Sequence, residues 1–186
     1  MKEKTAVSGN QKPHRIEIPA YTLAEELLNA ISHGIGALLG VAALVLMIVA
    51  GAKAHSTMAV VTGSIFGGAL ILLYTMSCIY HALKVNKAKR VFRVIDHCTI
   101  YLLIAGTYTP YTLLVLGGKV GWILFGVVWA GAVIGITFTA IDLKKFRVLS
   151  MTAYLLMGWV IIFAMKPLFA CFPAGGIIWL FVGGIL

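Results

Sequence analysis

Charged residues are scarce in this chain of 186 residues, at 11% of the total against about 25% in a typical soluble domain. Six long stretches contain no Asp, Glu, Lys or Arg at all: residues 27–52, 54–83, 97–118, 120–141, 148–165 and 167–186. A helix needs about 20 mostly apolar residues to cross a hydrocarbon core of roughly 30 Å. The first five stretches reach or approach that length. The sequence therefore predicts an all-α integral membrane protein and excludes a soluble globular domain.

Acidic residues are fewer still, 6 against 15 basic ones, and the basic residues are distributed unevenly. Most of them lie before the first span, between spans two and three, and between spans four and five, which share one side of the membrane. The opposite side has only Lys53, Lys119 and Lys166. The positive-inside rule then predicts a plasma (inner) membrane protein with a cytoplasmic N-terminus. Attraction of these loops to an anionic leaflet explains the +9 net charge, so the expected partner is the lipid bilayer and not nucleic acid.

Signals for processing or for several domains are also missing. The first 26 residues lack the apolar core of a cleaved signal peptide, so the first span is expected to act as an uncleaved anchor. No internal repeat or low-complexity linker divides the chain. We predict a cytoplasmic segment 1–26 and one transmembrane domain 27–186, with spans at about 27–51, 57–83, 97–116, 120–141, 148–166 and 174–186. Pairs of glycines four residues apart are expected at close helix contacts: Gly36 and Gly40, Gly63 and Gly67, Gly131 and Gly135.

The last stretch is expected to hold an incomplete helix. Pro167 and Pro173 predict a loop, because proline disrupts a helix interior. A sixth helix beginning near Ala174 would reach Leu186 before it had crossed a core of about 30 Å. The sequence is therefore interpreted as a shortened form of a longer protein.

Polar residues are rare in the uncharged stretches, where they usually mark function or a buried polar partner. Ser77 and His81, four residues apart, share one helix face near the inner end of span two. The predicted topology brings Asp96, which begins span three, to the same depth. Glu26, Asn29 and His33 reach that depth from span one. Imidazole is a common zinc ligand whose second ring nitrogen needs an orienting acceptor. A nearby carboxylate such as Asp96 could hold and deprotonate a metal-bound water; the alternative is a set of hydrogen-bonded interfacial residues.

The order and depth of these motifs resemble the hemolysin III family, the bacterial branch of the progestin and adipoQ receptor family within an alkaline-ceramidase-like superfamily. The resemblance runs from about residue 20 to the chain end. It rests on the following motifs in sequence order: Glu26-x2-Asn29-x3-His33-Gly34, Ser77-x3-His81, a basic loop, Asp96, and Gly106-Thr107-x2-Pro110.

This resemblance implies a seven-helix bundle, of which about five and a half helices are present, with a zinc ion near the cytoplasmic side. By the match, His81 is a metal ligand, Ser77 is its neighbour at the site, and Asp96 binds the metal's water. Two further histidines, on helix seven, are implied as ligands and have no match in this sequence. A catalytic zinc site has three protein ligands plus water. We therefore expect this chain not to hold zinc tightly.

Three functions follow as hypotheses. The first is a zinc-dependent hydrolase of a lipid amide or ester near the inner leaflet, with Asp96 as base and Ser77 as a hydrogen-bond donor to the oxyanion. The second is a receptor or membrane-homeostasis sensor with structural zinc. The third is the cytolytic activity in the family's name, although the chain has no cleavable signal and no amphipathic pore segment.

Overall fold

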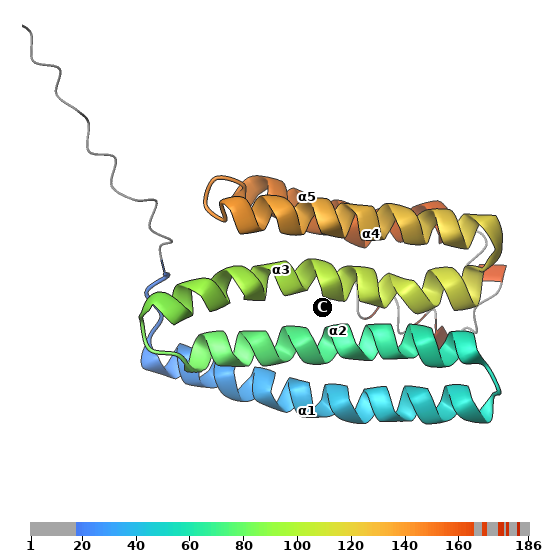
Figure 1. Ribbon diagram of the computed structural model, residues 1–186, viewed down its shortest axis with the longest axis horizontal. Helices are drawn as coiled ribbons and strands as arrows, with labels where there is room; N and C mark the ends of the chain where they lie inside the picture. The colour runs from blue at the N-terminus through green and yellow to red at the C-terminus, as the bar shows by residue number, and fades with distance from the viewer. Residues whose placement is uncertain (1–17, 166–168, 171–174, 177, 179–181, 183–186) are drawn as a thin grey trace, which may run out of the picture.

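The computed structural model describes residues 18–165, 169–170, 175–176, 178 and 182. Long helices make up almost all of this part of the chain, and consecutive helices run antiparallel (Figure 1). The third helix continues directly into a π-helical segment, and the fifth ends in a 3-10 segment. In order, the elements are α1 (Leu23–Lys53), α2 (Thr57–Ala82), α3 (Lys87–Pro110), the π-helix η1 (Tyr111–Leu116), α4 (Gly118–Ile141), α5 (Arg147–Trp159) and the 3-10 helix η2 (Val160–Ala164).

Among the described residues, four helices are long and apolar enough to cross a membrane: Leu23–Lys53, Thr57–Ala82, Lys87–Leu116 and Gly118–Ile141. The fifth expected span corresponds to a shorter apolar helix, Arg147–Phe163. Most of the expected sixth span, 174–186, lies outside the described residues. The all-α fold class predicted from the sequence is confirmed for the part of the chain that is described.

Two helices begin well before the predicted spans, at positions where capping side chains start them. Thr22 accepts a hydrogen bond from the Glu25 backbone amide, and the Glu25 carboxylate accepts one from the Thr22 amide, which starts α1 at Leu23. Asn86 accepts a hydrogen bond from the Lys89 amide and starts α3 at Lys87, ten residues before the predicted span at 97. Asp96 is therefore more than two turns inside α3, and not at the mouth of the helix as expected.

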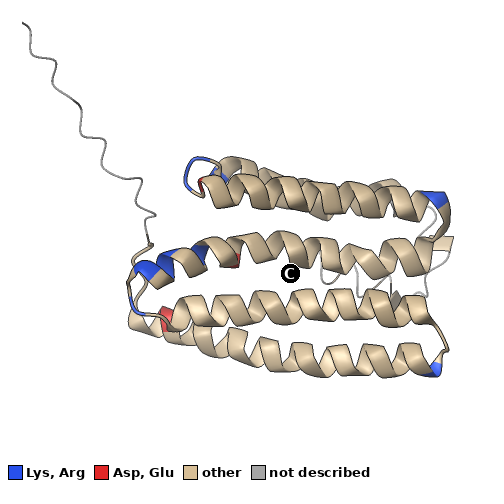
Figure 2. Ribbon diagram, in the orientation of Figure 1, with Lys and Arg blue, Asp and Glu red and all other residues tan. Residues whose placement is uncertain are grey.

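Basic residues gather at one end of the bundle, which we call the basic end (Figure 2). This end holds the start of α1, the α2–α3 connection and the α4–α5 connection. Lys53 and Lys119 lie at the opposite end, and Lys166 lies outside the described residues. The basic residues described at the basic end are Lys84, Lys87, Lys89, Arg90, Arg93, Lys144, Lys145 and Arg147.

Glycines allow neighbouring helices to approach closely, as the Gly-x3-Gly pattern predicted. A Cβ added at Gly67 would come within 2.8 Å of Leu44 on α1, and one added at Gly36 would come within 2.9 Å of the Tyr74 ring on α2. At Gly135 on α4 an added Cβ would overlap the Tyr101 ring of α3. Close backbone approach at small residues is a common way for membrane helices to associate.

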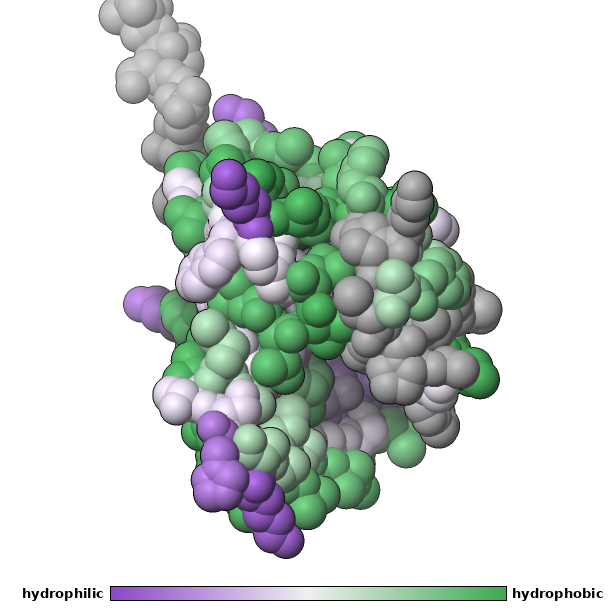
Figure 3. All heavy atoms as spheres, turned by 90° about the vertical axis from the view of Figure 1, so that its right-hand side faces the viewer, coloured by the Kyte–Doolittle hydropathy of each residue, from purple (hydrophilic) through white to green (hydrophobic). Residues whose placement is uncertain are grey.

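The buried core lies between α3, α4 and α5 and is partly aromatic. We call it the aromatic core; its members are Tyr101, Ala105, Tyr108, Val128, Ala132 and Met157. By contrast, α1 leaves many large apolar side chains exposed, among them Leu38 at 72% and Leu46 at 69%. Seen from the end opposite the basic end, much of the surface is hydrophobic (Figure 3). Such an exterior suits lipid and would be unusual on a soluble monomer.

Candidate metal centre at the basic end

Five polar side chains from three helices come together at the basic end. We call them the polar cluster: Glu26 and His33 on α1, Ser77 and His81 on α2, and Lys89 on α3. Ser77 and His81 are four residues apart, and Glu26 and His33 are seven apart, so each pair lies on one helix face. Because α1 and α2 are antiparallel neighbours, these two faces meet at the same depth.

Glu26 is the centre of the polar cluster. Its Oε2 lies 2.7 Å from His81 Nδ1, and its Oε1 accepts a hydrogen bond of 2.5 Å from Lys89 Nζ. Lys89 Nζ also donates to the Leu83 carbonyl at 2.9 Å. The Lys89 side chain is only 1% exposed, and Glu26 supplies the counter-charge that a buried ammonium requires. These contacts tie α1, α2 and α3 together.

The contact with Glu26 orients the His81 ring. An ionised carboxylate only accepts hydrogen bonds, so Nδ1 of His81 carries the proton that points to Glu26. In the neutral ring the lone pair is then at Nε2, which makes no hydrogen bond to any residue that the structure describes. The rings of Tyr80 and Tyr21 contact the imidazole edge-on, at centroid distances of 4.7 Å and 5.6 Å. A carboxylate that holds one ring nitrogen is the usual way to orient a metal-binding histidine.

His33 and Ser77 form a second pair beside the first. The Ser77 hydroxyl lies 3.3 Å from His33 Nδ1, and Ser77 is buried. The His33 and His81 rings are nearly parallel, 18° apart, with their centroids at 5.9 Å. Ser77 and His81 thus face the same way, as their spacing predicted, but each has a different partner on α1.

Two of the predicted site residues stay outside the polar cluster. The side chain of Asn29 makes no hydrogen bond to the cluster residues. Asp96 forms no hydrogen bond or ion pair with His81 or Ser77; its Oδ2 lies 4.0 Å from His97 Nδ1, and its backbone carbonyl accepts from the Thr99 hydroxyl. The carboxylate beside His81 is Glu26, whereas the sequence pointed first to Asp96.

Sequence reasoning missed Lys89 and Tyr80. Lys89 was counted with the basic loop, although it is buried and paired with Glu26. One signal was available, because a carboxylate within an otherwise apolar helix usually requires a partner of opposite charge. Tyr80 is 2% exposed and lies next to His81 in sequence, with its ring 5.0 Å from Lys89 Nζ. No pattern in the sequence distinguishes Tyr80 from an ordinary core tyrosine.

The polar cluster fits part of a zinc site. Among the described residues, no three His, Cys, Asp or Glu side chains gather closely enough to hold a metal ion. A catalytic zinc site has three protein ligands plus water. His81 Nε2 is a suitably oriented donor for one ligand position, and the described residues do not complete the set.

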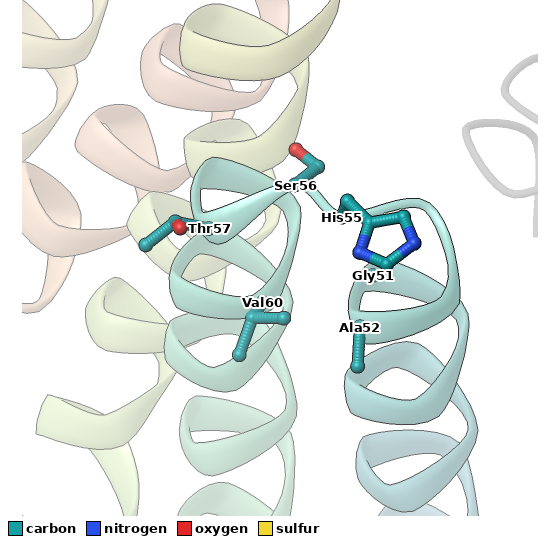
Figure 4. A pocket seen from close by; sticks show the side chains of 6 residues that line it. All are labelled: Gly51, Ala52, His55, Ser56, Thr57 and Val60. Atoms are coloured by element: carbon teal, nitrogen blue, oxygen red, sulfur yellow. The ribbon is translucent and has the colours of Figure 1, made fainter.

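A shallow hollow at the opposite end of the molecule is not a competing site. Gly51, Ala52, His55, Ser56, Thr57 and Val60 line it, at the turn between α1 and α2 (Figure 4). His55 is the one ionisable residue of this lining, and the hollow is open to its surroundings. The convergence of charged and hydrogen-bonding groups is at the basic end.

Comparison with known proteins gives a consistent family match. The family model described as haemolysin-III related matches residues 21–186. The "Hemolysin-3 homolog" of Bacillus subtilis (strain 168) is 45% identical over 166 residues, which are 89% of this chain and 78% of that protein. "Hemolysin-3" of Bacillus cereus is 42% identical over 162 residues, 87% of this chain and 74% of that protein. No solved structure matches the chain.

Proposed function

Since the chain belongs to the haemolysin-III-related family of multi-pass membrane proteins, we propose that it is a zinc-dependent hydrolase of a lipid amide or ester. The observation that carries the proposal is the pair formed by His81 and Glu26. It fixes an imidazole with a free Nε2 at the junction of three helices. In this proposal His81 is one zinc ligand, and the other ligands come from outside the described residues.

Zinc, when bound, would polarise the scissile carbonyl and lower the pKa of a water to about 7. The chain's own residues have separate roles in the proposal. Glu26 keeps the His81 ring in place, and the Ser77 hydroxyl, one turn away, donates a hydrogen bond to the developing oxyanion. Asp96 is the proposed base. Its carboxylate would have to approach on substrate binding, and catalytic hydrogen bonds often tighten only in that complex.

The location of the polar cluster supports a lipid substrate. It lies at the basic end, which we propose to be the cytoplasmic side of the plasma (inner) membrane, because basic loops are retained there. At this depth a lipid headgroup can reach the cluster sideways from the inner leaflet. The N-terminus is then cytoplasmic.

Two matched histidine substitutions test the proposal. His81→Asn and His55→Asn each replace an imidazole by an amide, but His55 lies in the turn at the opposite end, where its φ of 51° is acceptable for asparagine. We expect His81→Asn to lose zinc, measured by elemental analysis of the purified full-length protein, and to lose lipid cleavage. His55→Asn should retain both. Wild-type zinc content and hydrolysis in His81→Asn would refute the proposal.

A second function, a membrane receptor or sensor with structural zinc, is favoured by a different observation. Lys89, Glu26 and His81 join three helices, so a ligand that altered these contacts would shift the packing of the helices. Under this alternative, His81→Asn lowers the melting temperature and the intact wild-type protein shows no turnover. Turnover by the wild-type protein therefore distinguishes the hydrolase from the receptor or sensor.

The names of the relatives suggest cytolysis as a third function. Nothing in the polar cluster accounts for a pore. Dye release from liposomes containing the purified wild-type protein would distinguish bilayer permeation from hydrolysis.

A further inference from the structure

The buried ammonium group of Lys89 imposes a direction on the hydrogen bonds of the polar cluster. The Lys89 side chain is only 1% exposed, so water has little access to it. Its Nζ donates to Glu26 Oε1 and to the Leu83 carbonyl, and the Tyr80 ring lies 5.0 Å from it. An ammonium group has three donors and no acceptor. Any side chain at position 26 that bonds Lys89 must therefore turn an acceptor toward it.

The Glu26 carboxylate presents acceptors to both of its partners. Oε1 accepts from Lys89, and Oε2 lies 2.7 Å from His81 Nδ1. The hydrogen bond from Lys89 is charge-assisted, which makes it one of the stronger kinds in proteins. Lys89 thus holds one carboxylate oxygen, and the other is left to accept the proton of His81 Nδ1.

The His81 ring is surrounded by other rings that limit its rotation. Tyr80 and Tyr21 contact it edge-on, and the His33 ring lies nearly parallel to it at 5.9 Å. Because the ring has little freedom to turn, a change of partner at Nδ1 is answered by the proton. In a neutral imidazole the proton occupies one nitrogen or the other, and the hydrogen bond at one nitrogen decides which.

We propose that Lys89 is a positioning residue for His81: acting through Glu26, it keeps the imidazole proton on Nδ1 and the lone pair on Nε2. The position of this proton is a property of the metal-free chain and requires neither zinc nor turnover. Its consequence, that Nε2 stays available as a metal donor, rests on the proposed function. A ring with its proton on Nε2 would present a donor where a metal ion requires a lone pair.

Glu26→Gln tests this directionality, because an amide has one acceptor end and one donor end. Lys89 takes the amide oxygen, so the amide NH2 group turns toward His81 Nδ1, which must then accept. We expect the His81 proton to move to Nε2, with loss of the Nδ1–H signal. In the full-length protein the affinity for zinc should fall by about 10-fold to 100-fold, as is usual when the partner of a metal-binding histidine is changed.

The proton is located by nuclear magnetic resonance of the metal-free, full-length protein labelled with 15N-histidine in lipid nanodiscs. At about pH 8.5, where imidazole is ordinarily neutral, two-bond 1H–15N correlations distinguish the two tautomers. His81→Asn identifies the His81 signals by their loss. His97 is the internal reference: its Nδ1 donates to the Arg93 carbonyl at 2.8 Å, so it should keep the Nδ1 proton in every variant.

Removing Lys89 as well separates a positioning role from a structural one. In Glu26→Gln with Lys89→Met nothing holds the amide oxygen, so the amide can turn it toward His81, and the Nδ1–H signal should return at least in part. Glu26→Gln with Lys87→Met loses an exposed lysine of the same turn and should keep the Nε2 proton. Glu25→Gln changes the carboxylate that caps the start of α1, and it should leave His81 as in the wild type.

The proposal is wrong if Glu26→Gln keeps the proton on Nδ1, or if adding Lys89→Met restores no Nδ1–H signal. The wild-type spectrum is a further test that does not depend on the folding of variants at positions 26 and 89. A wild-type His81 with its proton on Nε2, or with protons on both nitrogens, would overturn the proposal. If the tautomers follow the expected pattern and the wild-type protein binds no zinc, the positioning role stands and the metal centre is refuted.

Discussion

The polar cluster and the aromatic core each join three helices, but they do so by different physical means. The cluster joins α1, α2 and α3 through one carboxylate, one ammonium and one imidazole. The core joins α3, α4 and α5 through close packing around Tyr101 and Tyr108. In the core the Tyr108 hydroxyl is fully engaged, accepting from the Ile161 amide and donating to the Gly158 carbonyl.

This difference supports the proposal that function lies in the polar cluster. A buried ion pair often adds little to stability compared with apolar residues of similar volume, because its charges are costly to remove from water. The aromatic core packs α3, α4 and α5 together with no ion pair among its members. The charges retained in the polar cluster are therefore in keeping with the chemical role that we propose for the oriented His81.

The largest expected effect comes from removing one partner of the ion pair between Lys89 and Glu26. Lys89→Met leaves the Glu26 carboxylate without its ammonium partner, and it should lower the free energy of unfolding by about 3–5 kcal/mol. Unfolding in lipid bicelles measures the loss. Lys87→Met, an exposed lysine of the same turn, is the control and should change stability little.

A double substitution sharpens this result. Glu26→Gln with Lys89→Met removes both charges, so much of the loss should be recovered. Additive losses in the double variant would mean that the two side chains do not act as a pair. In that case the polar cluster would contribute to stability through packing, as the aromatic core does.

A smaller effect is expected where the aromatic core is packed most tightly. Gly135→Ala would drive a methyl group into the Tyr101 ring, which has little room to move, and should cost about 1–3 kcal/mol. Gly126→Ala on the same helix meets nothing within 4 Å and should be neutral or stabilising by up to about 1 kcal/mol. Equal effects of the two substitutions in thermal unfolding would argue against this close contact of α3 and α4.

Much of the fold was accessible from sequence, because uncharged stretches of membrane length leave few alternatives to helices. The convergence of Glu26, His33, Ser77 and His81 also followed from helix spacing and depth. Which carboxylate faces His81 did not follow, because it depends on how each helix is rotated about its axis. That rotation is set by contacts such as Gly36 with Tyr74 and Gly67 with Leu44.

The start of α3 was predicted less well, for a related reason. Hydropathy marks where charges end, at residue 97, whereas the Asn86 cap starts the helix at Lys87. The added turns bring Lys89 into the bundle, where its side chain is buried. A lysine that appeared to be a loop charge is thereby brought next to Tyr80 and Glu26.

The smallest expected effect concerns single tyrosine hydroxyl groups in the aromatic core and packed against it. Tyr108→Phe would leave the Ile161 amide without its acceptor at the point where α5 changes into a 3-10 helix, and should cost about 1–2 kcal/mol. Tyr154→Phe removes only a donor to the His97 carbonyl, so its cost should be nearer 0.5–1 kcal/mol, which is about the lower half of the usual range. Chemical denaturation in bicelles would rank the two variants. If Tyr154→Phe proved more destabilising than Tyr108→Phe, the strongest hydrogen bond between α3 and α5 would be the one at the basic end, beside Asp96. The polar cluster and the aromatic core would then be less distinct as regions than the packing indicates.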